Sequence, residues 1–267
     1  RFFERLRRED PVHYTADSHY GPYWSVTKYK DIIKVEVNHQ IFSSSWEHGG
    51  GITLDEHPKG RERISFIRTD PPKHDEQRKV VSPIVAPLNL AKFADIIRER
   101  IGTILDALPR DEPFDWVDRV SVELTAQMLA TLFDFPLEQR RKLIYWSNIA
   151  TMDKNAGGEI SSEEQRNVIL MDCLREFTTL WNERINAKPQ PDLISMMAHG
   201  EATRNMTPRE FLGNIILLIV GGNDTTRNSI TGGLHALSQN PEEYQKLREN
   251  PGLIPTMVPE IIRWQSP

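Results

Sequence analysis

Apolar residues recur with a helical period over most of the chain beyond its first quarter. The clearest run spans 89–108, where apolar side chains return every three or four positions, at Leu90, Phe93, Ile96, Ile97, Ile101, Ile104, Leu105 and Leu108. That spacing places them on one face of a helix. The same period predicts helices over 114–133 and 163–185. Segment 70–83 begins with an acid and two prolines, which favours a helix start.

The longest predicted helix begins at a capping box. Thr207 suits the N-cap, Pro208 the first helical position and Glu210 the third. The next strong stop signal is the Asn-Pro pair at 240–241. A helix between these signals has about 32 residues and is roughly 48 Å long, at 1.5 Å per residue. Two shorter helices are expected in 241–264.

The N-terminal part has a different pattern. Segments 11–15 and 23–28 are rich in β-branched and aromatic residues, and a turn-like sequence separates them, which predicts a β-hairpin. Segment 28–44 has a helical pattern, and the glycine- and histidine-rich segment 47–60 is typical of a loop. Together, the elements predict one mainly α domain over residues 1–267, with a small β part near its start.

Composition narrows the class of protein. Hydrophobic residues make up 38% of the chain and charged residues 27%, and the net charge is −5, as is typical of a soluble globular protein. No basic patch with interleaved aromatic residues is present, so no nucleic acid partner is expected. The longest apolar stretch, Ile215–Val220, is far shorter than the roughly 20 residues of a membrane-spanning helix. We therefore expect no membrane span.

The single cysteine, Cys173, excludes an internal disulfide and fits a reducing compartment, so a cytoplasmic location is expected. Its neighbours form an amphipathic helical pattern, and we interpret Cys173 as a small, packed, apolar residue. The chain starts at Arg1 without a signal-peptide pattern and stops at Pro267 directly after a predicted helix. We therefore expect a fragment that is incomplete at both ends.

The middle of the longest helix carries the unusual sequence GGNDT. Gly221 and Gly222 each cost a helix about 1 kcal/mol relative to alanine. Without side chains they allow a flat ligand to lie against the backbone. Thr225 can bond a carbonyl one turn back, and a partly buried Asp224 can pass protons. The alternative is a glycine-kinked helix whose Asp224 simply reaches a surface.

Two further pairs lie at helical spacing. His74 and Arg78 share one helix face and can clamp an anion such as a carboxylate, although the charged residues around them also fit a solvated face. Glu260 and Arg263 can form an ion pair, which we expect to be partly buried because apolar residues surround it. An isolated E-x-x-R pattern is also a common accident.

The order and spacing of these motifs resemble the cytochrome P-450 superfamily, the heme-thiolate monooxygenases. Segment 70–78 is similar to the family's heme-flanking helix, 221–225 to the oxygen-binding groove of its long central helix, and 260–263 to its E-x-x-R helix. The early hairpin and the helix after it also match, so the resemblance covers essentially the whole chain. Segments 70–87 and 221–229 resemble bacterial members that hydroxylate medium-chain alkanes and fatty acids at the terminal carbon.

The resemblance implies a cytochrome P-450 fold, mainly α with a small N-terminal β part, truncated before the heme-cysteine loop. It implies heme b (iron protoporphyrin IX) as cofactor. His74 and Arg78 would bind the heme propionates. Gly221 and Gly222 would let the porphyrin and O2 approach the long helix.

The resemblance also implies the chemistry. The family inserts one oxygen atom of O2 into a C–H bond of an apolar small molecule, with electrons from a ferredoxin-type redox partner and its reductase. Asp224 and Thr225 would deliver protons that favour O–O cleavage over peroxide release. Glu260 and Arg263 would lock the core under the heme. Substrate contacts are expected from the loop around 46–54.

One feature departs from the family. The iron-ligating cysteine of these enzymes lies in a loop well after the E-x-x-R helix, and Cys173 has no such surroundings. The fragment alone is therefore expected to be inactive. Two alternatives remain: a non-catalytic helical binding or scaffold protein on the same fold, and an unrelated helical enzyme that uses Asp224 and Glu260 as acid and base. Leu217, Leu218 and Ile219 fit either an apolar substrate channel or the core.

Overall fold

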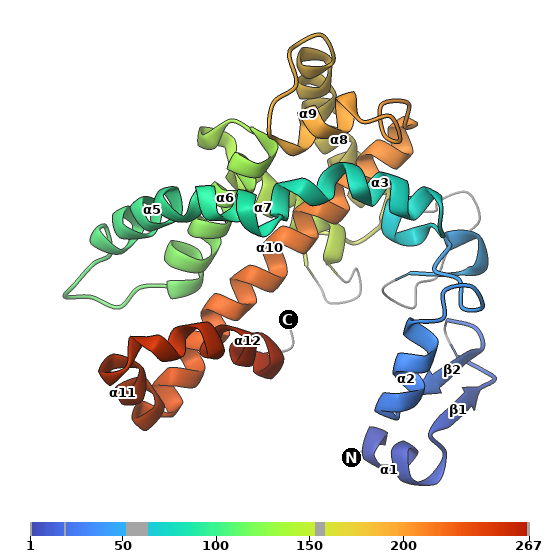
Figure 1. The fold of residues 1–267 in the computed structure, drawn as a ribbon, viewed down its shortest axis with the longest axis horizontal. Coiled ribbons are helices and arrows are strands. Elements are labelled where there is room, and N and C mark those ends of the chain that lie inside the picture. Colours follow the sequence, from blue (N-terminus) through green and yellow to red (C-terminus); the bar gives the residue numbers. More distant parts are fainter. Residues whose placement is uncertain (1, 19, 52–63, 153–157, 266–267) are drawn as a thin grey trace. The chain divides into compact units, whose positions relative to one another are not determined.

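The structure, a computed structural model, describes residues 2–18, 20–51, 64–152 and 158–265. The chain divides into two compact units: unit 1 contains Arg1–Lys79 and Arg209–Asn214, and unit 2 contains Val80–Pro208 and Ile215–Pro267. Helix α10, drawn in orange in Figure 1, has residues in both units. This division does not test the single-domain interpretation of residues 1–267, which stays a prediction.

Unit 1 holds the β-hairpin and the first helices. Its elements are α1 (Phe2–Glu9), β1 (Val12–Thr15), β2 (Tyr23–Val26), α2 (Tyr29–Glu36), the 3₁₀ turns η1 (Trp46–His48) and η2 (Phe66–Arg68), and most of α3 (Lys73–Val81). The strands are antiparallel, with Val12 opposite Val26. The rings of Tyr14 and Trp24 lie 4.7 Å apart as a cross-strand pair. The predicted hairpin is confirmed.

Unit 2 is helical throughout its described part. Its elements are η3 (Ser82–Val85), α4 (Pro87–Leu90), η4 (Ala91–Phe93), α5 (Ala94–Asp106), the π-helical turn η5 (Val117–Val122), α6 (Glu123–Phe133), η6 (Leu137–Gln139), α7 (Arg141–Thr151), α8 (Glu163–Ile185), α9 (Leu193–His199), most of α10 (Pro208–Gln239), α11 (Pro241–Glu249), η7 (Pro251–Leu253) and α12 (Ile254–Gln265). Four buried aromatic rings from α6, α7, α8 and the loop after α6 pack together in its core: Phe133, Phe135, Trp146 and Phe177.

The strongest helix predictions are confirmed, and several details differ. The long helix α10 has 32 residues, and α8 matches 163–185. Segment 28–44 forms a helix only as far as Glu36. The expected helix over 89–108 is divided among α4, η4 and α5, and 114–133 begins with a π-helical turn. Most of the predicted loop 47–60 lies outside the described residues.

Within the part of the chain that the structure describes, one helical stretch is apolar and long enough to cross a membrane. Within Lys73–Asp106, an 18-residue window has a mean hydropathy of 1.5, and 11% of that window is buried. The sequence pattern missed it because a few charged residues and two prolines interrupt the run. A single stretch that meets these tests does not establish a membrane protein, so the absence of a span stays a prediction.

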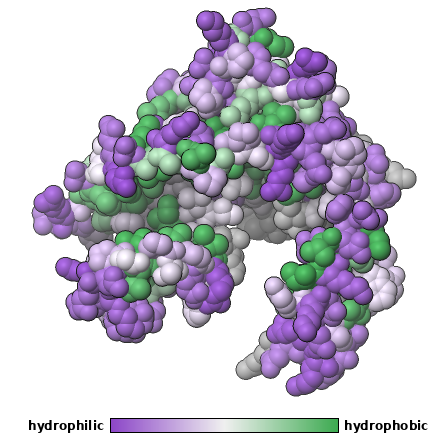
Figure 2. Space-filling view, in the orientation of Figure 1, coloured by the Kyte–Doolittle hydropathy of each residue, from purple (hydrophilic) through white to green (hydrophobic). Residues whose placement is uncertain are grey.

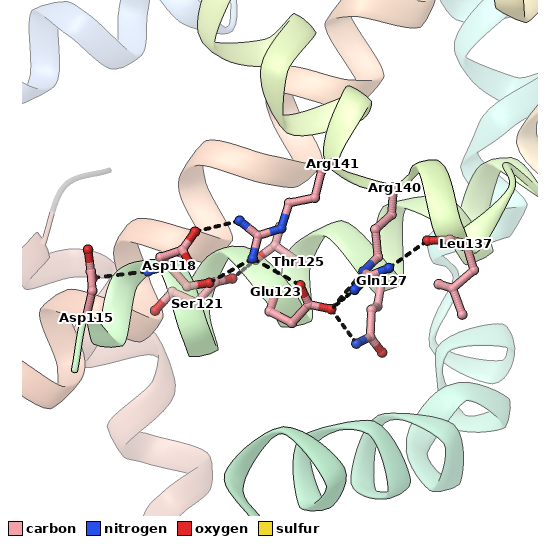
Figure 3. Close-up of polar contacts among 9 residues, drawn as sticks. All are labelled: Asp115, Asp118, Ser121, Glu123, Thr125, Gln127, Leu137, Arg140 and Arg141. Carbon is pink, nitrogen blue, oxygen red and sulfur yellow. Dashed lines mark hydrogen bonds and ion pairs between the residues drawn. The ribbon is translucent and has the colours of Figure 1, made fainter. Parts of the chain in front are cut away.

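An ion-pair network fixes the start of α7 against α6. The carboxylate of Glu123 accepts hydrogen bonds from Gln127 (2.8 Å) and Arg140 (2.7 Å), and a guanidinium nitrogen of Arg141 lies 3.2 Å away (Figure 3). Arg141 also binds Asp118 at 2.5 Å. Burial alone would raise the pKa of Glu123, but the hydrogen bonds from Gln127 and Arg140 and the two arginine charges outweigh it and hold that pKa below its usual value.

We expect Glu123→Gln to lower the free energy of unfolding by about 3 kcal/mol, because it leaves two partly buried arginines without their shared anion. Glu123 has a lowered pKa in the folded state, so its contribution is complete above the unfolded pKa and is lost as the pH falls through the folded value. Urea denaturation at neutral and acidic pH measures both effects. Asp95→Asn, in an exposed pair with Arg98, is the control with little expected change. Equal losses for both variants would contradict the network's role.

Candidate functional site

The GGNDT motif lies inside α10, and the backbone stays α-helical through it. Gly221 is exposed, and a Cβ atom added to it would meet no atom within 4 Å. A Cβ added to Gly222 would lie 2.8 Å from Cδ2 of Leu129 on α6. The two glycines therefore have different structural roles. Gly222 allows α6 to pack closely against α10, whereas Gly221 leaves bare backbone on an exposed face.

This difference predicts opposite effects for two similar substitutions. Gly221→Ala should raise the free energy of unfolding by up to about 1 kcal/mol, because alanine favours the helix and its Cβ meets open space. Gly222→Ala gives the same helical gain but forces the Leu129 side chain to move, so its net effect should be near zero or destabilising. Urea denaturation of the two variants measures the difference. Equal stabilisation by both would show that Leu129 does not constrain Gly222.

Asp224 is half-buried and surrounded by hydrogen-bond donors. Its Oδ1 accepts from Arg227 (2.9 Å) and from the side-chain amide of Asn223 (2.9 Å), and the Ser147 hydroxyl of α7 lies 3.5 Å away. Burial raises the pKa of Asp224, although the charge of Arg227 and the contact with Ser147 act in the opposite direction. A carboxyl group that keeps its proton to higher pH is better suited to proton transfer near neutrality.

Thr225 lies on the exposed side of α10. Its Oγ1 donates a hydrogen bond to the carbonyl oxygen of Gly221 at 3.0 Å, one turn back, as the sequence predicts. Thr225 and Gly221 therefore share one exposed face of the helix, and the contacts of Asp224 lead instead toward α7. The oxygen lone pairs of Thr225 stay available to accept a hydrogen bond from a molecule on that face.

Sequence reasoning missed the partners of Asp224. Arg227 stands three residues after Asp224, so helical spacing was enough to suggest that pair. Asn148 accepts a hydrogen bond from Arg227 at 3.3 Å, and Ser147 precedes it on α7. Neither residue has a signal in the sequence, because both reach Asp224 only through the packing of α7 on α10.

His74 and Arg78 lie one turn apart on α3, as predicted. His74 is half-buried, with its Nδ1 2.8 Å from the Asp75 carboxylate and its ring 6.3 Å from the ring of Phe66. Arg78 is exposed. Both side chains belong to unit 1, whereas residues 221–225 belong to unit 2. Their common role at one ligand therefore stays a prediction.

Glu260 and Arg263 form the predicted ion pair on α12, but the expected burial is wrong. Their side chains approach to 2.5 Å while remaining 58% and 65% exposed, respectively. The side chain of Ile261 faces α10, where a Cβ on Gly233 would lie 2.8 Å from its Cδ1. Helix α12 thus packs against α10 along a narrow strip of its surface. The apolar residues next to Glu260 and Arg263 in the sequence do not cover this ion pair.

The apolar side chains of α12 stay largely uncovered. Exposed apolar side chains follow its length, at Ile254, Val258, Ile262 and Trp264. Hydrophobic residues are visible over α12 in Figure 2. Glu260 and Arg263 stabilise each other's charged state. The hydrogen bond between them lowers the pKa of Glu260 and raises the pKa of Arg263. The role of these two residues under a heme stays a prediction.

Cys173 is confirmed as a packed residue. Its side chain is fully buried on α8, and burial raises the pKa of its thiol far above the usual value. This environment suits a packed thiol and does not suit a metal-ligating thiolate. Among the described residues, no group of three or more His, Cys, Asp or Glu side chains is arranged to hold a metal ion.

Known proteins of one family match this chain over nearly its whole length. Linalool 8-monooxygenase from Pseudomonas putida is 33% identical over 99% of the chain and 67% of its own length. The structure of cytochrome P-450-153 from Novosphingobium aromaticivorans superposes with a TM-score of 0.86 at 41% identity, and that of CYP153D17 from Sphingomonas sp. PAMC 26605 with 0.84 at 46% identity. Each of these two alignments covers 98% of this chain and 65% of the other.

No protein-family model matches the chain. The chain spans about two thirds of the length of the curated relatives that it matches, between 62% and 67%. Relatives named as cytochromes P-450 are present among both the curated proteins and the solved structures. Heme b is the cofactor of such proteins. The predicted mainly α cytochrome P-450 fold with a small β part is confirmed, and the chain belongs to the cytochrome P-450 family.

Proposed function

We propose that the complete protein containing this chain is a heme-dependent monooxygenase that inserts one oxygen atom of O2 into a C–H bond of an apolar substrate. The observation that carries this proposal is the composition of α10. An exposed face with bare backbone at Gly221 and the hydroxyl of Thr225 lies next to the half-buried carboxyl of Asp224. A thiolate-bound heme supplies the activation of O2, and the protein supplies the pocket and the protons.

The residues of the chain fit parts of such a cofactor. A porphyrin with two carboxylates needs cations at its edge and a flat, uncrowded face. His74 and Arg78 would hold the carboxylates. Gly221 would admit a flat ring, because a Cβ at its position would meet no atom within 4 Å. The described residues do not supply a suitable cysteine ligand for the iron. Cys173 is buried on α8, where burial raises the pKa of its thiol, so it does not fit the role of the iron ligand.

Within this function, Asp224 and Thr225 have separate tasks. Asp224 takes a proton from solvent and passes it toward the exposed face of α10, with Arg227 and Ser147 holding its Oδ1 in place. Thr225 accepts a hydrogen bond on that face and orients the donor, while its own proton stays bonded to the Gly221 carbonyl. Proton supply of this kind favours substrate oxidation over release of hydrogen peroxide.

We infer terminal hydroxylation of a medium-chain alkane or fatty acid as the reaction. The likeness of segments 70–87 and 221–229 to bacterial hydroxylases of such compounds supports this substrate class. The half-buried Leu217 and Leu218 present apolar surface one turn before the glycines, whereas Ile219 is fully buried and belongs to the core. Electrons would come from a ferredoxin-type partner and its reductase, and the protein would work in the cytoplasm.

The test is a product assay of the complete reading frame that contains these codons, expressed with a ferredoxin and its reductase. We expect octane to give 1-octanol and decanoic acid to give its ω-hydroxy acid, identified by gas chromatography and mass spectrometry. Hydroxylation only at inner carbons would contradict the terminal assignment. Heme uptake without any oxidation product would favour the alternative, a non-catalytic binding or scaffold protein on the same fold, whose only support is that this sequence holds no cysteine in a ligand loop.

A further inference from the structure

A buried amide lies in the second turn of α10. Asn214 is only 1% exposed. Its Oδ1 accepts a hydrogen bond from the backbone N–H of Phe66 at 2.8 Å, and its Nδ2 donates to Oε1 of Gln77 on α3 at 3.3 Å. An amide buried this deeply is destabilising unless its polar atoms are bonded. Both ends of the side chain are in use, so its orientation is fixed.

The neighbouring residue brings the two chain segments into backbone contact. A Cβ added to Gly213 would lie 1.8 Å from the carbonyl oxygen of Ile64. No side chain is tolerated there unless the backbone moves. The segment 64–66 therefore lies directly on α10, with Gly213 permitting the approach and Asn214 bonding the amide of Phe66. All of these residues belong to unit 1.

The two partners of Asn214 stand beside the cation pair of α3. Gln77, itself 4% exposed, is one turn after His74 and directly precedes Arg78. Phe66, the other partner, has its ring 6.3 Å from the ring of His74. Lys73 pairs with Glu210 as a second link between α3 and α10, but Lys73 is half-exposed and such pairs contribute little. The buried hydrogen bonds of Asn214 therefore fix the orientation of α3 on α10 more strongly than this ion pair does.

We propose that Asn214 is a positioning residue that sets His74 and Arg78 for binding the heme carboxylates. It acts through Gln77, which fixes the rotation of α3, and through Phe66, which packs beside His74. The proposal rests on the proposed function, because it assigns the cation pair to heme. An amide suits this position because it offers an acceptor to an N–H group and a donor to a side-chain oxygen at the same time. Leucine has the same shape and offers neither.

The experiment compares three variants of the complete holoprotein. Asn214→Leu removes both bonds, and Gln77→Leu removes only the link to α3. Thr203→Val is the matched control, since it removes a buried hydroxyl that donates to the Met197 carbonyl in unit 2. Two rates are measured: the amide hydrogen exchange of the peptide that contains Phe66, and the transfer of heme to an excess of an apoprotein acceptor.

We expect Asn214→Leu to speed both rates about tenfold, as the loss of a buried hydrogen bond predicts. Gln77→Leu should speed heme transfer alone, and Thr203→Val should change neither rate. Faster exchange at Phe66 with heme transfer at the wild-type rate would overturn the positioning role, as would equal heme loss in the Thr203→Val control. If Asn214→Leu does not fold, unchanged heme transfer in Gln77→Leu overturns the role independently.

Failure of the proposed function gives a different result. A wild-type protein that takes up no heme would overturn that function, and the role of Asn214 toward heme with it. The exchange rate at Phe66 would then still report whether Asn214 holds segment 64–66 on α10. The two failures are therefore distinguishable in one set of measurements.

Discussion

Replacing Asp224 by asparagine is expected to lower the turnover of the complete enzyme at least about 100-fold, the usual scale of a lost proton donor. Asparagine keeps an oxygen that accepts from Arg227 and Ser147, so the packing of α7 on α10 should survive. It has no proton to deliver. Steady-state product formation at saturating substrate measures the loss, and heme content and substrate-induced spectral change should stay at wild-type values.

The pH dependence of stability provides a second check on Asp224. Burial raises its pKa in the folded state, with Arg227 and Ser147 acting against that rise. Its contribution to stability is therefore complete below the ordinary value of 3.8 and is lost as the pH rises through the raised value. The stability of wild type relative to Asp224→Asn should fall across that interval. Wild-type turnover in the variant, or a relative stability that rises with pH, would contradict the role of Asp224.

Replacing Thr225 by alanine is expected to uncouple electron use from product formation. The variant loses the hydroxyl that shares an exposed helix face with Gly221, so the hydrogen-bond acceptor on that face disappears. We expect most of the reducing equivalents to appear as hydrogen peroxide, while the rate of cofactor oxidation by the reductase changes much less. Parallel measurement of NADH consumption, peroxide and hydroxylated product gives the coupling ratio.

Thr225→Ser is the matched control for this change. Serine keeps a hydroxyl that can donate to the Gly221 carbonyl and accept on the exposed face, so coupling should stay within about twofold of wild type. Unchanged coupling in Thr225→Ala would remove Thr225 from the proton path. Equal uncoupling in both variants would show that the methyl group, and therefore packing, is responsible.

Local signals in the sequence were enough to predict most of the helices. The ends of α10 follow from the Thr207–Glu210 capping box and the Asn-Pro stop, and α8 follows from its apolar period. Helix α7 was missed. Its N-cap residue, Arg140, makes no side-chain cap, and buried residues lie around much of the helix, so no narrow amphipathic stripe marks it.

The short helices α1 and α9 were also missed. Helix α9 has seven residues, too few for a hydrophobic period, although its Asp192 N-cap bonding the Ser195 amide was a usable signal. Helix α1 has eight residues and only Leu6 buried. Elements of this length depend on tertiary packing more than on their own sequence.

The motif residues could be identified from the sequence, whereas their packing contacts and exposure could not be predicted from it. The pair on α3 and the GGNDT segment stand out by composition and spacing. The difference between Gly221 and Gly222 depends on Leu129, which is far away in the chain. The exposure of Glu260 and Arg263 depends on which stripe of α12 faces α10. Apolar neighbours in sequence indicate that a helix has a buried side, but not which residues lie on it.

The most direct test of the account is the absorbance spectrum of the complete protein after reduction and exposure to carbon monoxide. A thiolate-bound heme moves the Soret band of the CO complex to an unusually long wavelength, and we predict that shift with one heme per chain. A protein that purifies without heme, or a CO complex whose Soret band lies where histidine-bound hemes absorb, would contradict the assignment of this chain to a heme-thiolate monooxygenase.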